Sequence, residues 1–157
     1  LFVSASENIA WLLNIRGHDT EYTPIPNSHL LIDKNKKIRF YCNLKKISPS
    51  LKKKLINVKF FDIKSINKDL SAISGKKFIV DLNTCSFYFE KSISLNNEIF
   101  NYKDPIYFLK AVKGKKEIQN IKVAHIYDGV ALTKYLFWLK KNYNKKKVTE
   151  MTASQKL

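Results

Sequence analysis

Three groups of side chains in this 157-residue sequence have the types and spacing that could do chemistry. The first is the run His18-Asp19-Thr20-Glu21, which places an imidazole and two carboxylates within four residues. A metal site needs ligands that converge on one point, and adjacent residues in a loop rarely converge. We therefore expect a polar loop here, and a contribution to a ligand pocket is the alternative.

The other two groups are a histidine–aspartate pair and an unusual arginine. His125 and Asp128 are three residues apart, so on a helix their side chains can meet. This spacing favours a hydrogen-bonded pair at a domain interface over a catalytic pair. Arg16 is one of only two arginines, with Arg39, among 29 basic residues. It either grips a carboxylate with its planar guanidinium or is an ordinary surface residue, and the sequence leaves both open.

No further catalytic motif is present. The four glycines do not compose a phosphate-binding loop or a dinucleotide fingerprint, and no serine lies in a nucleophile elbow. Cys42 and Cys85 are far apart in apolar runs, which predicts two reduced, buried thiols rather than a disulfide or a zinc ribbon. The residue inventory alone predicts a non-catalytic α/β module.

Composition narrows the class of protein. A chain of this length with 45% hydrophobic residues suits one globular domain with an appended segment. The net charge of +16 suggests that the protein binds a polyanion such as nucleic acid. However, almost every basic residue is lysine and the lysines are spread along the chain, as on a solvated surface. No stretch approaches the roughly 18 to 20 apolar residues of a membrane span, and no signal peptide is recognisable. We expect a cytoplasmic protein that binds neither nucleic acid nor membranes.

Hydrophobic periodicity predicts the elements that must position these residues. A first helix over residues 5–14 turns Trp11 inward, and Gly17 is expected to stop it. Residues 78–81 form an apolar strand whose lack of alternation predicts burial on both faces. The remaining expected elements are a hairpin of strands 28–33 and 38–42 joined by the polar turn 34–37, a strand at 58–61, and helices from Pro49, at 66–73 and at 86–92. Strands and helices thus alternate, which predicts an α/β fold with a mixed β-sheet flanked by helices.

Two helices are expected after Asp104-Pro105, a short one at 106–112 and a long one at about 115–142. The long helix has two apolar faces, so we expect a neighbouring domain to cover it. Thr152 and Gln155 have the spacing of a capping box, which predicts that a helix begins there. The sequence ends within the first turn of this helix. Because the chain also begins without methionine, we expect a fragment of a longer protein.

Collinear segments resemble one family, the three-domain Xaa-Pro aminopeptidases (aminopeptidase P). SENIAWLLNIRGHD at residues 6–19 is similar to that family's DEIAWLLNLRGSD segment. The further similar segments are KFIVDLNTCS at 77–86, DPIYFLKAVK at 104–113, AHIYDGVAL at 124–132 and VTEMTA at 148–153. The resemblance covers nearly the whole chain.

The resemblance implies a division of labour. Residues 1–108 would be the middle, creatinase-N-like domain, and residues 109–157 the linker and first helices of a catalytic domain of pita-bread fold. In this family the catalytic domain holds two divalent metal ions, manganese or zinc, through two Asp, one His and two Glu. They activate a water that attacks the bond between the first residue and proline. The fragment itself would hold no cofactor, no metal ligand and no catalytic residue, and would be inactive alone.

The resemblance also implies a site and partners. Trp11, Arg16 and His18 lie in the best-matched segment, so they are the candidates for an edge that faces the substrate cleft. His18 stands where the family has a small residue, which leaves the pocket role of this loop open. The expected partners are a peptide with proline at its second position and the protein's own catalytic domain, and homodimerisation is left open. The alternatives are a domain of a non-peptidase, creatinase-like relative and a basic module for nucleic acid or anionic surfaces.

Overall fold

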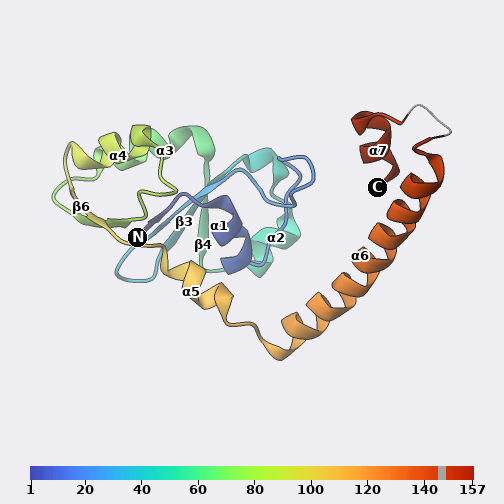
Figure 1. Ribbon diagram of the computed structural model, residues 1–157. Helices are drawn as coiled ribbons and strands as arrows, with labels where there is room; N and C mark the ends of the chain where they lie inside the picture. The colour runs from blue at the N-terminus through green and yellow to red at the C-terminus, as the bar shows by residue number, and fades with distance from the viewer. Residues whose placement is uncertain (145–147) are drawn as a thin grey trace. The chain divides into compact units, whose positions relative to one another are not determined.

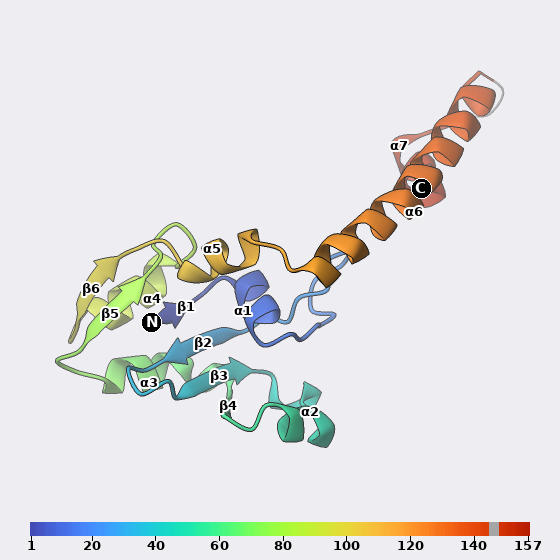
Figure 2. The same ribbon diagram turned by 90° about the horizontal axis from the view of Figure 1, so that it is seen from below.

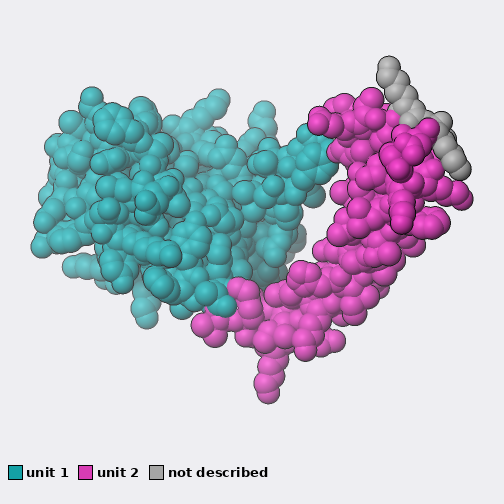
Figure 3. Space-filling model, viewed as in Figure 1, with its two compact units in different colours: residues 1–111 teal, residues 112–157 magenta. Residues whose placement is uncertain are grey.

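The computed structural model describes residues 1–144 and 148–157, and the chain divides into two units, residues 1–111 and 112–157 (Figure 3). The first unit is an α/β domain, and the described residues of the second form two helices. The division falls close to the predicted boundary after residue 108, although the roles assigned to the two parts remain predictions.

A six-stranded mixed sheet organises the first unit, with the strand order β4-β3-β2-β1-β5-β6 (Figure 1). Strand β2 pairs antiparallel with β1 and with β3, and the other neighbours are parallel. The predicted hairpin and the predicted mixed sheet are therefore confirmed. The strands are β1 (Phe2–Val3), β2 (His29–Ile32), β3 (Ile38–Cys42), β4 (Val58–Asp62), β5 (Lys77–Val80) and β6 (Glu98–Asn101).

Short helices connect the strands of this sheet. Two of them begin at serine caps, because Ser48 accepts a hydrogen bond from the Leu51 amide and Ser86 from the Phe89 amide. The helices are α1 (Ser6–Leu12), α2 (Pro49–Lys54), α3 (Ile66–Ala72), α4 (Phe87–Ser94) and α5 (Pro105–Ala111), with single 3-10 turns η1 (Leu44–Lys46) and η2 (Ile63–Ser65).

The sheet separates two apolar cores, because adjacent residues of a strand point to opposite faces. In β1, Phe2 belongs to one core and Val3 to the other. The first core receives residues from α3 and α4, and the second from α1 and α5 (Figures 1 and 2). The first comprises Phe2, Leu31, Tyr41, Ile66, Leu70, Phe78, Val80 and Ile93, and the second Val3, Ile9, Leu13, Ile15, Leu30, Phe40, Cys42 and Ile106.

The prediction that residues 78–81 are buried on both faces is wrong. Phe78 and Val80 are buried in the first core, but Ile79 is 43% exposed. The reason is the extent of the second core, which reaches β1 but includes no residue of β5 or β6. One face of the sheet is therefore open at the β5–β6 end of this unit.

The first helix is shorter than predicted and ends for a different reason. Helix α1 ends at Leu12, and the chain turns away at Asn14, whose φ of 49° is the left-handed conformation that asparagine tolerates after a helix. Gly17 is not the stop that was predicted; it lies in the following loop. Trp11 is partly buried and packs against the second core.

The second unit contains α6 (Lys115–Asn142), which confirms the predicted long helix, and α7 (Glu150–Lys156). The predicted capping box at Thr152 and Gln155 is wrong by three residues. Thr149 is the cap, and it exchanges reciprocal hydrogen bonds with Thr152, which therefore lies inside the helix. None of the residues of α6 is buried. In the described parts of the chain no helix is both long and apolar enough to cross a membrane.

His29 on β2 predicts that stability depends on pH. Its ring packs against Phe2 and Phe89, with centroids 5.9 and 4.8 Å away, and its buried Nδ1 has no hydrogen-bond partner among the described residues. Burial lowers the pKa of His29 below its ordinary value. As the pH falls, His29 is therefore protonated first in the unfolded chain. The free energy of unfolding should decrease as the pH is lowered below about 6.5.

This dependence can be measured by urea unfolding of the chain between pH 7.5 and 5. His29→Leu removes the titrating ring and should flatten the curve in this range. Asn35→Leu provides the control, because it changes an exposed side chain that does not titrate and should leave the slope as in the wild type. An unchanged slope in His29→Leu would show that another group causes the dependence.

Candidate functional site

The three candidate cleft residues, Trp11, Arg16 and His18, lie on or beside the loop between α1 and β2. Hydrogen bonds join the two ends of this loop. The Gly17 amide donates to the Pro24 carbonyl over 3.2 Å. Asp19 accepts a hydrogen bond from the Asn27 amide at 2.8 Å and also pairs with Lys46 of η1. The loop is therefore tied to itself and to the turn after β3.

Asp19 is the electrostatic centre of this arrangement. Its side chain is only 12% exposed, whereas that of Lys46 is 55% exposed. The hydrogen bond from Lys46, followed by that from the Asn27 amide, lowers the pKa of Asp19 below its ordinary value. The stabilisation that these two interactions give the folded chain is therefore fully present above the ordinary pKa of the carboxyl group. It is lost as the pH falls through the lowered pKa of Asp19.

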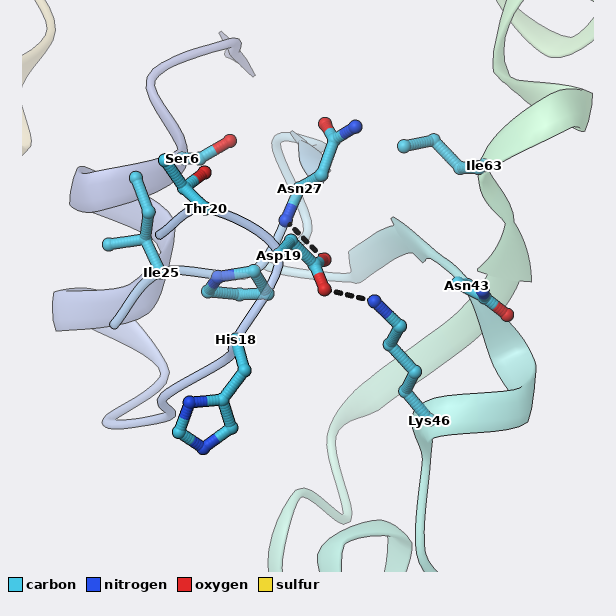
Figure 4. Close-up of a pocket in the computed structure, with 10 residues that line it drawn as sticks. Ser6, His18, Asp19, Thr20, Ile25, Asn27, Asn43, Lys46 and Ile63 are labelled. Atoms are coloured by element: carbon cyan, nitrogen blue, oxygen red, sulfur yellow. Dashed lines mark hydrogen bonds and ion pairs between the residues drawn. The ribbon is translucent and has the colours of Figure 1, made fainter. Parts of the chain in front are cut away.

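A hollow of about 520 Å³ opens between this loop and the turn that leads from β3 into η1 (Figure 4). Such a volume is in the range of small-ligand pockets. The loop and the start of α1 form one wall, and η1 with its cap residue forms the other (Figure 4). The lining residues are Ser6, His18, Asp19, Thr20, Ile25, Pro26, Asn27, Asn43, Lys46 and Ile63.

The structure separates the three predicted cleft residues. His18 is exposed and lines the hollow. Arg16 lines a neighbouring hollow of about 70 Å³, and its guanidinium donates to the Ile15 carbonyl at 2.8 Å. Trp11 lies on α1 and lines neither hollow. His18 and Asp19 of the predicted polar run are brought together at the hollow, and Glu21 is exposed and does not line it.

The His125–Asp128 pair lies on α6 in the second unit. Both residues line a hollow of about 520 Å³ together with the end of α7. Within residues 1–144 and 148–157 no hydrogen bond joins their side chains, so the predicted pair is not formed in this chain.

Sequence reasoning missed a buried polar network in the first unit. Asn8 on α1 is fully buried, and its amide donates to Asp104 Oδ2 at 2.7 Å across 96 residues of sequence. The other carboxylate oxygen of Asp104 accepts from the Ile106 amide at 3.0 Å. The Asp104 amide in turn donates to Asp81 Oδ2 at 2.9 Å. This network joins α1, the end of β5 and the start of α5.

Two contacts from α5 extend the network to the surface. The Lys110 ammonium donates to Asn8 Oδ1 at 2.6 Å, and the Tyr107 hydroxyl donates to Glu7 at 2.7 Å. The hydrogen bond to Glu7, followed by burial, raises the pKa of Tyr107 to about 12. The available signal was an asparagine inside the apolar first helix, but nothing local identifies its distant partner. The network is a structural clasp that holds α5 on α1.

The site offers binding groups rather than the donor set of a metal centre. Among the described residues no three His, Cys, Asp or Glu side chains are grouped so that they could hold a metal ion. Both cysteines are free; Cys42 is buried and Cys85 partly buried, and burial raises the pKa of each thiol to about 11. The residues that line the hollow offer amide, hydroxyl and imidazole groups, the Asp19–Lys46 ion pair and apolar surface.

Comparison with known proteins gives a consistent result along the chain. Residues 1–117 match the family model described as "Creatinase/Prolidase N-terminal domain". The chain is 32% identical over 172 residues to "Probable Xaa-Pro aminopeptidase P" of Paracoccidioides brasiliensis strain Pb03, covering 99% of this chain and 28% of that protein. It is 31% identical over 164 residues to "Xaa-Pro aminopeptidase 1" of Dictyostelium discoideum, covering 100% of this chain and 26% of that protein.

A solved structure has the same fold. The X-prolyl aminopeptidase of Caenorhabditis elegans, described as a cytosolic enzyme with a di-nuclear active site, matches with a TM-score of 0.80 at 22% sequence identity. The match covers 99% of this chain and 26% of that one. This chain thus spans about a quarter of the length of the proteins that it matches.

Proposed function

The chain belongs to the creatinase/prolidase N-terminal domain family, and on this premise we propose that it is the non-catalytic, cleft-flanking part of an Xaa-Pro aminopeptidase. The observation that carries the proposal is the collinear match to relatives named Xaa-Pro aminopeptidase over 99 to 100% of the chain. A creatinase-like or polyanion-binding role is not favoured by any of these relatives.

The length of the relatives and the exposure of α6 support the proposed division of the chain. The chain accounts for only 26 to 28% of these relatives, so a longer protein would contain the remainder. Residues 1–108 would be the middle domain, and residues 109–157 would lead into the catalytic part. Exposed apolar residues along α6 support this, because a long helix with apolar residues on several sides needs cover. They include Ile118, Ile121, Val123, Ile126, Val130, Leu132, Leu136 and Phe137.

Hydrolysis would belong to the remainder of the longer protein. The di-nuclear active site described for the C. elegans enzyme supports two metal ions in that part. We propose that these are divalent ions, manganese or zinc. The described residues of this chain do not provide a fitting donor set, so they are given no step in the hydrolysis. The substrate would be a peptide with proline at its second position, and the cytosolic relative supports a cytoplasmic protein.

This chain would contribute the loop beside α1 as one edge of the substrate cleft. Trp11, Arg16 and His18 remain the proposed contacts. Arg16 is exposed, and among residues 1–144 and 148–157 no carboxylate pairs with its guanidinium, which donates to the Ile15 carbonyl. A guanidinium in this state is available to hold a carbonyl or carboxylate of a bound peptide.

Steady-state kinetics of the longer protein from the same gene would test this role. Arg16→Ala should lower kcat/KM for an Xaa-Pro peptide by about tenfold, the loss expected for one charge-assisted contact. The chain's other arginine supplies the control, since Arg39→Ala on β3 should leave the kinetics unchanged. The 157 residues alone, supplied with manganese, should release no product.

Two results would count against the proposal. If the longer protein leaves Xaa-Pro peptides intact, the assignment to this enzyme class is wrong. If it cleaves them and Arg16→Ala has wild-type kcat and KM, the proposed cleft role of the arginine is wrong.

A further inference from the structure

The hollow beside the loop is held open by bonds that need no ligand. Its loop wall is fixed by Asp19, which accepts from Asn27 and pairs with Lys46. Its opposite wall is fixed by Asn43, whose side chain accepts from the Lys45 amide at 3.1 Å and caps η1. Preorganised walls lower the entropic cost of binding, because few groups must be ordered when a ligand enters.

The polar groups of the lining match a peptide backbone. The Asn27 side chain is exposed at the hollow and forms no hydrogen bond within residues 1–144 and 148–157, and Figure 4 shows it on the loop wall, across from Asn43. An amide side chain both donates and accepts, as a peptide N–H and C=O require. Ile25, Pro26 and Ile63 add apolar surface for a side chain between the polar walls.

The charge around the hollow selects one end of a peptide. The carboxylate of the lining, Asp19, is paired with Lys46 and hydrogen-bonded to a backbone amide. Segment 43–63, which supplies the wall opposite the loop, contains six lysines and one acidic residue, Asp62, and the whole chain carries a net charge of +16. A positive field of this kind attracts anionic groups, so it favours a carboxylate terminus over an ammonium terminus.

We propose that this hollow binds the C-terminal part of short peptides, with Asn27 as the residue that recognises the backbone and the lysines of η1 and α2 attracting the free carboxylate. That these peptides are substrates of the longer protein rests on the proposed function. In an enzyme that removes the first residue, the N-terminus lies at the reacting centre, so the hollow would hold the distal end.

The 157-residue chain itself can be tested with the tripeptide Ala-Pro-Ala as probe, in the free-carboxylate form and as the C-terminal amide. Two-dimensional ¹H–¹⁵N NMR should show shifts for residues 18–27 and 43–46 that saturate with peptide. The amide form should bind about threefold to tenfold more weakly, and added salt should reduce the difference, because the attraction is electrostatic.

A matched pair of asparagine variants isolates the recognition. Asn27→Ala should weaken binding of the free peptide by about threefold to tenfold, which is the loss of one or two neutral hydrogen bonds. Asn35→Ala removes an exposed asparagine from the β2–β3 turn and should bind as the wild type. Both residues are exposed, and far-UV circular dichroism would verify that each variant is folded.

The outcomes separate this inference from the proposed function. Shifts outside the hollow, or equal affinity in Asn27→Ala and wild type, would overturn the peptide site even if the longer protein cleaves Xaa-Pro peptides. Binding at the hollow by a chain whose longer parent does not cleave them would support the peptide site and overturn the enzyme assignment.

Discussion

Asp104→Ala is expected to lower the free energy of unfolding of this chain by about 3 to 4 kcal/mol, the largest effect of any single change considered. Asp104 is only 2% exposed, and its two oxygens accept from Asn8 and from the Ile106 amide. Truncation leaves two buried donors without an acceptor, and the Asn8 donor is fully buried. Urea unfolding followed by near-ultraviolet circular dichroism would measure the loss.

Two further variants test whether the stability lost in Asp104→Ala comes from its buried hydrogen bonds. Asp104→Asn keeps the shape but turns one acceptor into a donor, so we expect an intermediate loss of about 1 to 2 kcal/mol. Glu98→Ala removes a carboxylate that is 60% exposed and 3.8 Å from Lys77, and should cost under about 0.5 kcal/mol. Equal losses at Asp104 and Glu98 would show that the clasp between α1 and α5 contributes no more than a surface ion pair.

Gly17→Ala is expected to cost about 2 to 3 kcal/mol and to disturb the candidate site as well. A Cβ at this position would lie 2.7 Å from both the Cα and the N of Pro26. These are backbone atoms that cannot rotate away, so one leg of the loop must move. Because Asn27 follows Pro26 directly, the movement should shift the NMR signals of residues 18–27 and 43–46.

Gly75 provides the matched control in the same unit. Its φ is 64°, and an added Cβ would have no heavy atom within 4 Å among the described residues. Gly75→Ala should therefore cost about 1 kcal/mol through backbone strain alone, with the loop signals unchanged. If Gly17→Ala lowered the free energy of unfolding no more than Gly75→Ala, the loop would be flexible enough to accommodate the added Cβ. A preformed hollow would then be ruled out.

The substitutions at Asp104 and at Gly17 disturb different parts of the first unit. Asp104 fixes the helix that leads out of the first unit, whereas Gly17 fixes the wall of the hollow. In the proposed position beside a substrate cleft, the domain would need to hold both in place, since small displacements of binding groups are costly to function. Intact binding in Asp104→Asn and weakened binding in Gly17→Ala would show that the hollow depends on the loop rather than on overall stability.

The sequence by itself determined most of the helices and strands and their order, but strands β1 and β6 were not predicted from it. Two strand-like runs on either side of the polar turn 34–37 predicted the hairpin, and Ser48 followed by Pro49 predicted the start of α2. The long helix was placed correctly at 115–142, and the motif at residues 6–19 indicated the family. The helices and strands depend on propensity, capping and periodicity, which act over a few residues and can be read directly, whereas the family was indicated by resemblance alone.

Only the tertiary structure decided which distant residues meet. The bond between Asn8 and Asp104, the pairing of Asp19 with Lys46 and the contact of Gly17 with Pro26 depend on how the sheet and its helices pack. The exposure of Ile79 also depends on which face the helices cover, which no pattern within residues 78–81 reveals. Local sequence fixes torsion angles and apolar faces, but a pocket arises where separate segments close on one another, and that closure is a property of the packed chain.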